Sequence, residues 1–160
     1  MEGWEQRVAE VWARIDAAPP EAFRALISAL AAERGNDDPE GLFERASSHD
    51  STDQEAAAAP LYERALAQGL TGIRRRRAVI QLASTLRNLG QPERSLEFLE
   101  AEMKRPSDML DDAVSAFLAL AYCDLGRERQ ATSLALKALS KHLPRYNRSL
   151  NRYADELVSD

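Results

Sequence analysis

The side chains that most often perform catalysis or bind metals are few in this sequence. It contains one cysteine, Cys123, and two histidines, His49 and His142. They do not form a metal-binding cluster, and no nucleophile and base stand at a recognisable spacing. No glycine-rich phosphate loop is present either. The sequence therefore argues against an enzyme and predicts no metal ion and no cofactor.

Each of these residues has an ordinary structural interpretation. Cys123 stands among apolar residues, which disfavour ionisation of a thiol, and we expect it to be buried and inert. We expect both histidines to lie at the surface. The acidic residues near positions 37, 50 and 111 fall at predicted helix ends or turns, where a carboxylate caps a helix or offsets its dipole.

Four consecutive arginines, Arg74 to Arg77, open a predicted helix. The positive end of the helix dipole makes cations unfavourable there, so something should offset the cost. One explanation is pairing with acidic residues of neighbouring helices. The other is a contact with an acidic partner or with the carboxylate of a peptide.

A second cationic stretch lies near the C-terminus. Between positions 127 and 152 the chain has one acid, Glu128, although its overall net charge is -5. The basic residues of this stretch are Arg127, Arg129, Lys137, Lys141, Arg145, Arg148 and Arg152. Nucleic-acid binding through this stretch is the alternative function. The overall charge and the lack of clearly exposed aromatic side chains beside the cations argue against it.

The composition predicts an all-α fold. Of 160 residues, 44% are hydrophobic and 29% are charged, as in an ordinary globular chain. Strong helix formers dominate, while β-branched and aromatic residues are sparse. The first residues lack the pattern of a secretory signal, and no apolar run reaches the roughly 18 residues that a membrane span needs. We therefore expect a cytoplasmic protein with no membrane contact.

Apolar spacing and turn residues place the first helices. One amphipathic pattern predicts a helix over about 3–16, and two prolines then end it and begin a second helix that stops before Gly35. Asp38 and Pro39 suit the N-cap and first position of a third helix. Pro60 interrupts a later helical pattern, so that helix either begins near Ala59 or bends, and we favour a bend.

A small residue recurs at equivalent places in four predicted helices, and in three of them a large residue follows one turn later. The small residue admits a neighbouring helix, and the large one fills the space beside it. The motifs begin at Ala22, Ala58, Ser95 and Ala131, which are separated by 36, 37 and 36 residues. The helices before the last two motifs repeat as well, with Leu82-Ala83-x2-Leu86-x3-Gly90 matching Leu118-Ala119-x2-Tyr122-x3-Gly126. The two glycines fit the turns between antiparallel helices.

This spacing resembles the tetratricopeptide repeat family, whose helix-turn-helix unit is nominally about 34 residues long. The segment 118–144 is the closest match. The resemblance implies a single domain over 1–160, a right-handed superhelical array of antiparallel helix hairpins. Its parts are a degenerate N-terminal hairpin (3–35), three hairpins (39–144) and a capping helix (145–159), with Tyr146, Leu150, Tyr153 and Leu157 on one face of the cap.

The resemblance also implies a non-catalytic scaffold that binds a peptide or helix of a partner protein in a concave groove. Small bacterial proteins of this layout often pair, so a homodimer is expected. Carried onto this sequence, a polar and cationic part of the groove is formed by Arg77, Ile80, Ser84, Arg87 and Asn88. An apolar part follows, formed by Ala113, Ala116, Leu120, Cys123 and Asp124.

The segment 113–126 is apolar nearly all round, so its helix needs cover on more than one face. We expect one face to pack on adjoining helices through Val114, Leu118, Ala121 and Leu125. Ala116, Leu120 and Cys123 should face the groove. The cap helix, a second copy of the chain or a partner could cover this second face.

Overall fold

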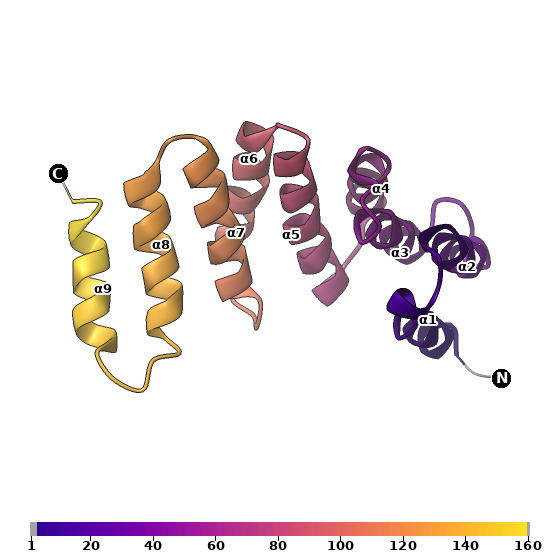
Figure 1. Ribbon diagram of the computed structural model, residues 1–160, viewed down its shortest axis with the longest axis horizontal. Coiled ribbons are helices and arrows are strands. Elements are labelled where there is room, and N and C mark those ends of the chain that lie inside the picture. Colours follow the sequence, from indigo (N-terminus) through magenta and orange to yellow (C-terminus); the bar gives the residue numbers. More distant parts are fainter. Residues whose placement is uncertain (1–2, 160) are drawn as a thin grey trace. The chain divides into compact units, whose positions relative to one another are not determined.

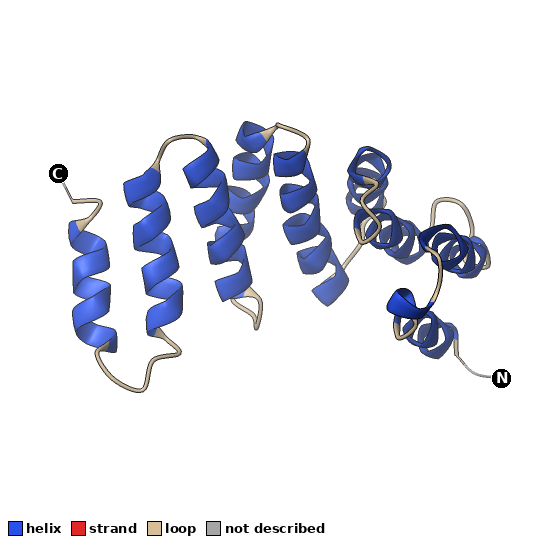
Figure 2. Cartoon of the chain, in the orientation of Figure 1, coloured by secondary structure: helices blue, strands red, loops and turns tan. Residues whose placement is uncertain are grey.

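The computed structural model describes residues 3–159, in which helices are joined by short loops (Figure 1). No strand occurs among these residues (Figure 2), and the all-α prediction is confirmed. The helices are α1 (Trp4–Trp12), α2 (Pro20–Ala32), α3 (Pro39–Asp50), α4 (Glu55–Ala67), α5 (Gly72–Asn88), α6 (Pro92–Met103), α7 (Asp111–Asp124), α8 (Glu128–Ser140) and α9 (Asn147–Glu156), with a 3-10 turn at Ile15–Ala17. None of these helices is long and apolar enough to cross a lipid bilayer.

The chain divides into two compact units. Unit 1 is Met1–Thr85 and unit 2 is Leu86–Asp160, so the division falls within α5. In unit 1, α2 packs against both α1 and α3, and α3 packs against α4. The core of this unit is built on large side chains that are almost completely buried, namely Phe23, Ile27, Leu42, Phe43 and Tyr62.

The start of α3 is as predicted. The side chain of Asp38 accepts a hydrogen bond of 2.8 Å from the backbone amide of Gly41, and Pro39 is the first helical residue. α1, in contrast, ends at Trp12 rather than near Asp16. The Trp12 ring packs edge-on against Phe23 of α2, with ring centroids 5.0 Å apart, and the chain after it turns into the 3-10 segment.

α4 begins at Glu55 and continues through Pro60, so it does not begin near Ala59. Proline removes the amide that would bond to the carbonyl of Ala56. Both residues are exposed, which leaves that carbonyl within reach of water. The position of the proline near the surface explains how the helix tolerates it, while the bend stays a prediction.

In unit 2, α7 packs against α6 and α8, and α8 packs against α9. Figure 1 shows α7, α8 and α9 side by side in chain order, each antiparallel to the next. Leu99, Val114, Leu118, Ala121 and Ala131 are buried between these helices. Three of these side chains belong to α7, which therefore forms the centre of the unit.

The burial of its side chains sets the orientation of α9. Tyr146 and Tyr153 are 77% and 53% exposed, whereas Ala154 is completely buried. The side-chain amide of Asn147 donates to the carbonyl of Ser140, one of the last residues of α8, at 2.5 Å. Because α9 is fixed by this bond and by the burial of Ala154, the face with the two tyrosines does not form the inward side.

Candidate partner-binding surfaces

The arginines that open α5 lie in different environments in unit 1. Arg74 pairs with Glu5 of α1 at 2.5 Å and with Glu44 of α3 at 3.1 Å. The hydrogen bond with Glu5 is the main reason why the pKa of Arg74 is raised. Arg77 is exposed, and its guanidinium carbon lies 5.2 Å from the centre of the Phe43 ring. Arg74 is thus paired within the chain, whereas Arg77 presents its charge at the surface.

The other predicted groove residues of unit 1 are less accessible. Ser84 is half-buried, and Ile80 is 6% exposed, so Ile80 does not share the open surface of Arg77 as expected. The reason is that consecutive residues of α5, which point to different sides of the helix, are buried. Its neighbours Ala78 and Val79 are buried as well, so this part of α5 is packed on more than one side.

A buried polar network joins α3, α4 and α5 beneath this surface. The carboxylate of Asp50 accepts hydrogen bonds from Thr85 at 2.9 Å and from Tyr62 at 3.2 Å. Burial raises the pKa of Asp50, although these two hydrogen bonds oppose the shift. Asp50 lies at a helix end, as expected, but its side chain links three helices of unit 1, which its sequence position alone does not indicate.

Among residues 3–159, no group of three or more His, Cys, Asp or Glu side chains is arranged to hold a metal ion. His49 is half-buried rather than at the surface, and burial followed by the charges of Arg24 and Arg45 lowers its pKa. His142 is exposed, as expected, and its Nε2 atom lies 2.8 Å from a carboxylate oxygen of Asp112.

The outward face of α7 carries a strip of apolar side chains in unit 2. We call Ala116, Leu120 and Cys123 the α7 strip. Leu120 is 44% exposed, and the other two are exposed as well. The expectation that Cys123 is buried is therefore wrong. Its position one turn from Leu120 directs it away from the buried face of α7, which Val114 and Leu118 form.

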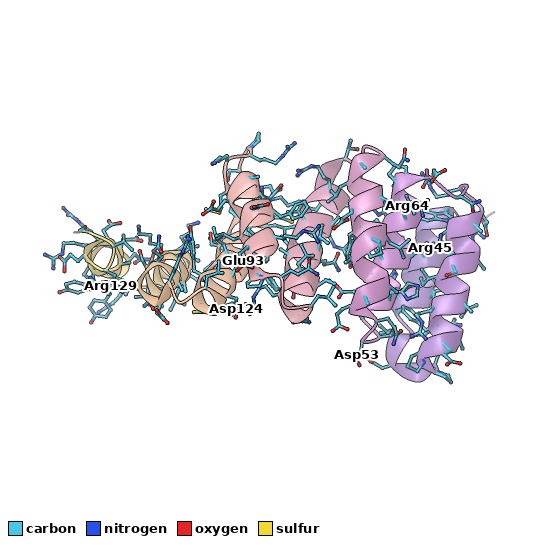
Figure 3. The ribbon with its side chains drawn as sticks, turned by 90° about the horizontal axis from the view of Figure 1, so that it is seen from above. Arg45, Asp53, Arg64, Glu93, Asp124 and Arg129 are labelled. Atoms are coloured by element: carbon cyan, nitrogen blue, oxygen red, sulfur yellow. The ribbon has the colours of Figure 1, made fainter. Side chains whose placement is uncertain are left out.

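An ion pair lies at the C-terminal end of the α7 strip. The Nε atom of Arg87 donates to Asp124, which is labelled in Figure 3, at 2.5 Å. Both residues were predicted to line the groove, and the structure brings them together. The guanidinium of Arg87 is therefore already paired with a carboxylate of the chain itself. Asn88 is exposed and Ala113 is half-buried.

Two sets of residues were not found from the sequence. Glu44 is almost fully buried in α3 and accepts hydrogen bonds from both Trp12 and Arg74. A glutamate beside the apolar pair Leu42 and Phe43 is a weak signal for such a buried acid. The second set is Tyr146 and Tyr153, whose exposure the sequence did not indicate because their spacing equally fits a buried face.

Antiparallel helix hairpins that recur every 36 or 37 residues, and that pack in chain order within each unit, define a helical-repeat protein. The tetratrico peptide repeat family model matches residues 39–157, and the chain belongs to this family. Proteins of this family are in general scaffolds for protein–protein interaction and typically are not enzymes. The chain matches no curated protein and no solved structure.

Proposed function

We propose that the chain is a non-catalytic scaffold that binds a peptide or helix of a partner protein through the α7 strip. The exposure of Leu120 carries this proposal. The flanking side chains of the strip, Ala116 and Cys123, are small, so Leu120 stands between two shallow positions. An apolar side chain of a partner can contact Leu120 and fill one of these positions, as in helix or peptide recognition by a groove.

The ion pair beside the strip changes the kind of polar group that a partner should bring. Because Arg87 and Asp124 neutralise each other, a lone carboxylate has little electrostatic reason to bind there. The pair still offers N–H donors and carboxylate acceptors at its edges. A backbone peptide group or a side-chain amide of the partner suits this arrangement.

Arg77 is the candidate for an acidic group, and it belongs to unit 1. Its guanidinium is exposed and rests on the face of Phe43, which limits its freedom before any partner binds. A planar, partly fixed guanidinium is suited to bidentate binding of a carboxylate. We therefore assign acidic partner groups to Arg77 rather than to Arg87.

Two leucines give a matched test of the α7 strip. Leu120→Asp places a charge on the strip, and Leu139→Asp places the same charge on α8, where Leu139 is 50% exposed. Each tagged variant is used to capture proteins from the native lysate, followed by quantitative mass spectrometry. We expect Leu120→Asp to lose at least one partner that wild type and Leu139→Asp retain. Identical capture by all three proteins would contradict the assignment.

Light scattering separates a partner protein from a second copy of the chain. The monomer has a mass of 17.8 kDa. Particles of twice this mass at micromolar concentration, converted to monomers by Leu120→Asp but not by Leu139→Asp, would assign the α7 strip to self-association. Both variants change exposed side chains, so their melting temperatures should stay close to that of wild type.

A further inference from the structure

Two exposed aromatic rings, one within α9 and one at its N-cap, lie beside exposed arginines. Tyr146 and Tyr153 are mostly accessible, and the guanidinium carbon of Arg152 lies 4.8 Å from the centre of the Tyr153 ring. Arg145 and Arg148 are exposed and form no ion pair with any residue between 3 and 159. The sequence argued against nucleic-acid binding because no aromatic side chain was clearly exposed beside the cations. The structure places two exposed tyrosines there.

Tyr146 is the N-cap of α9 and has a left-handed backbone conformation, whereas Tyr153 lies within the helix, next to Arg152. Arg148 and Arg152 are four positions apart, on one side of the helix. A surface hollow of about 610 Å³ is lined by Tyr146, Arg148 and Arg152 together with Asn147 and Ser149. In Figure 3, side chains project from the side of α9 (yellow) that faces away from α8.

We propose that this surface, the α9 face formed by Tyr146, Arg148, Arg152 and Tyr153, binds single-stranded nucleic acid. Bases of a single strand stack on tyrosine rings, and arginines neutralise the phosphates between them. An acidic peptide would engage the arginines but would leave both rings without a flat partner. A duplex would keep its base faces hidden. A single strand can contact both the tyrosine rings and the arginines.

The cations of the α9 face are available to phosphates. Arg152 lies 3.9 Å from Glu156, and both side chains are more than half exposed, so this pair is loose and readily replaced. Lys137, by contrast, is paired with Asp155 at 2.6 Å. Arg148 and Arg152, together with Arg145 just before the α9 face, thus supply about three phosphate contacts, which predicts a slope of about -2 for the logarithm of affinity against the logarithm of salt concentration.

The test uses fluorescence anisotropy of labelled twelve-nucleotide oligo(U) and oligo(dT) with the full chain, over a series of salt concentrations. We expect binding at low salt with the slope given above. Tyr153→Ala should weaken it about fivefold or more, and Tyr153→Phe should restore it because the ring is kept. Arg148→Ala should weaken binding and make the slope shallower by about 0.7. Arg14→Ala, an exposed arginine of unit 1, is the matched control and should change nothing.

Three results would overturn the proposal. The first is no binding of either oligonucleotide at low salt. The second is competition by an oligo-glutamate peptide of equal charge as effective as competition by unlabelled oligonucleotide, which would assign the α9 face to acidic peptides. The third is equal weakening by Arg14→Ala and Arg148→Ala. Circular dichroism on each variant verifies folding, and Arg148→Ala keeps the test decisive if Tyr153→Ala is unstable.

Discussion

Replacing Glu44 by alanine should destabilise unit 1 strongly, although the residue has no place on a binding surface. Glu44 is 4% exposed, and its carboxylate joins three helices. One oxygen accepts a hydrogen bond from the indole N–H of Trp12 in α1 at 2.7 Å, and the other accepts from Nε of Arg74 in α5 at 3.1 Å. The substitution removes both bonds at once.

The size of the effect follows from these contacts. A hydrogen bond to a charged group contributes about 1.5–3 kcal/mol to stability. Arg74 keeps its pairing with Glu5 and is partly exposed, so losing its hydrogen bond to Glu44 should cost an amount near the lower limit of this range. Among residues 3–159, Glu44 is the only side chain that accepts a hydrogen bond from the indole N–H of Trp12, and the substitution removes it. We therefore expect Glu44→Ala to lower the free energy of unfolding by about 3 kcal/mol.

Urea unfolding followed by tryptophan fluorescence measures this loss. Trp4 and Trp12 are the two tryptophans of the chain, and both lie in α1, so the signal reports on unit 1. Asp37→Ala is the control, because Asp37 pairs with Arg64 where both side chains are at least half exposed. Its loss should be about 0.5 kcal/mol or less. Equal unfolding midpoints for the two variants would refute the role given to Glu44.

Three further substitutions test local features of unit 1. Asp38→Ala removes the N-cap of α3 and should cost about 1 kcal/mol in thermal unfolding. Gly41→Leu should cost about 1–3 kcal/mol by overpacking, because a Cβ at this position would lie 3.1 Å from the backbone oxygen of Ala31. Burial raises the pKa of Asp50 above its value in the unfolded chain, so its carboxylate lowers stability at neutral pH, and acidification through the raised pKa relieves this cost. The stability of Asp50→Asn relative to wild type should therefore increase from pH 4 to pH 7 in urea titrations, and a difference independent of pH would contradict it.

The repeat pattern predicted much of the fold because close packing of helices depends on local residue size. Ala58, Ser95 and Ala131 occupy equivalent places in the repeat, and all three are buried. A large side chain at any of them would hold neighbouring helices apart, so their spacing carries information about packing. Asp38 and Pro39 specified the start of α3 because capping involves only adjacent residues.

Features that depend on distant residues could not be predicted in this way. Arg87 and Asp124 are 37 positions apart, and no local rule pairs them. The rotation of α9 depends on the bond from Asn147 to the carbonyl of Ser140, whereas the tyrosine spacing alone fitted an inward face equally well. The apolar neighbours of Cys123 in sequence lie on other faces of α7, so they do not indicate whether the thiol is exposed.

The exposure of Cys123 allows the most direct test of the α7 strip, because it is the only cysteine of the chain. The measurement is the rate of alkylation of Cys123 by a maleimide, with and without a saturating amount of a purified partner whose capture depends on Leu120. We predict rapid alkylation of the free chain and strong protection in the complex. An alkylation rate that the bound partner leaves unchanged would contradict the assignment of the α7 strip as the binding surface.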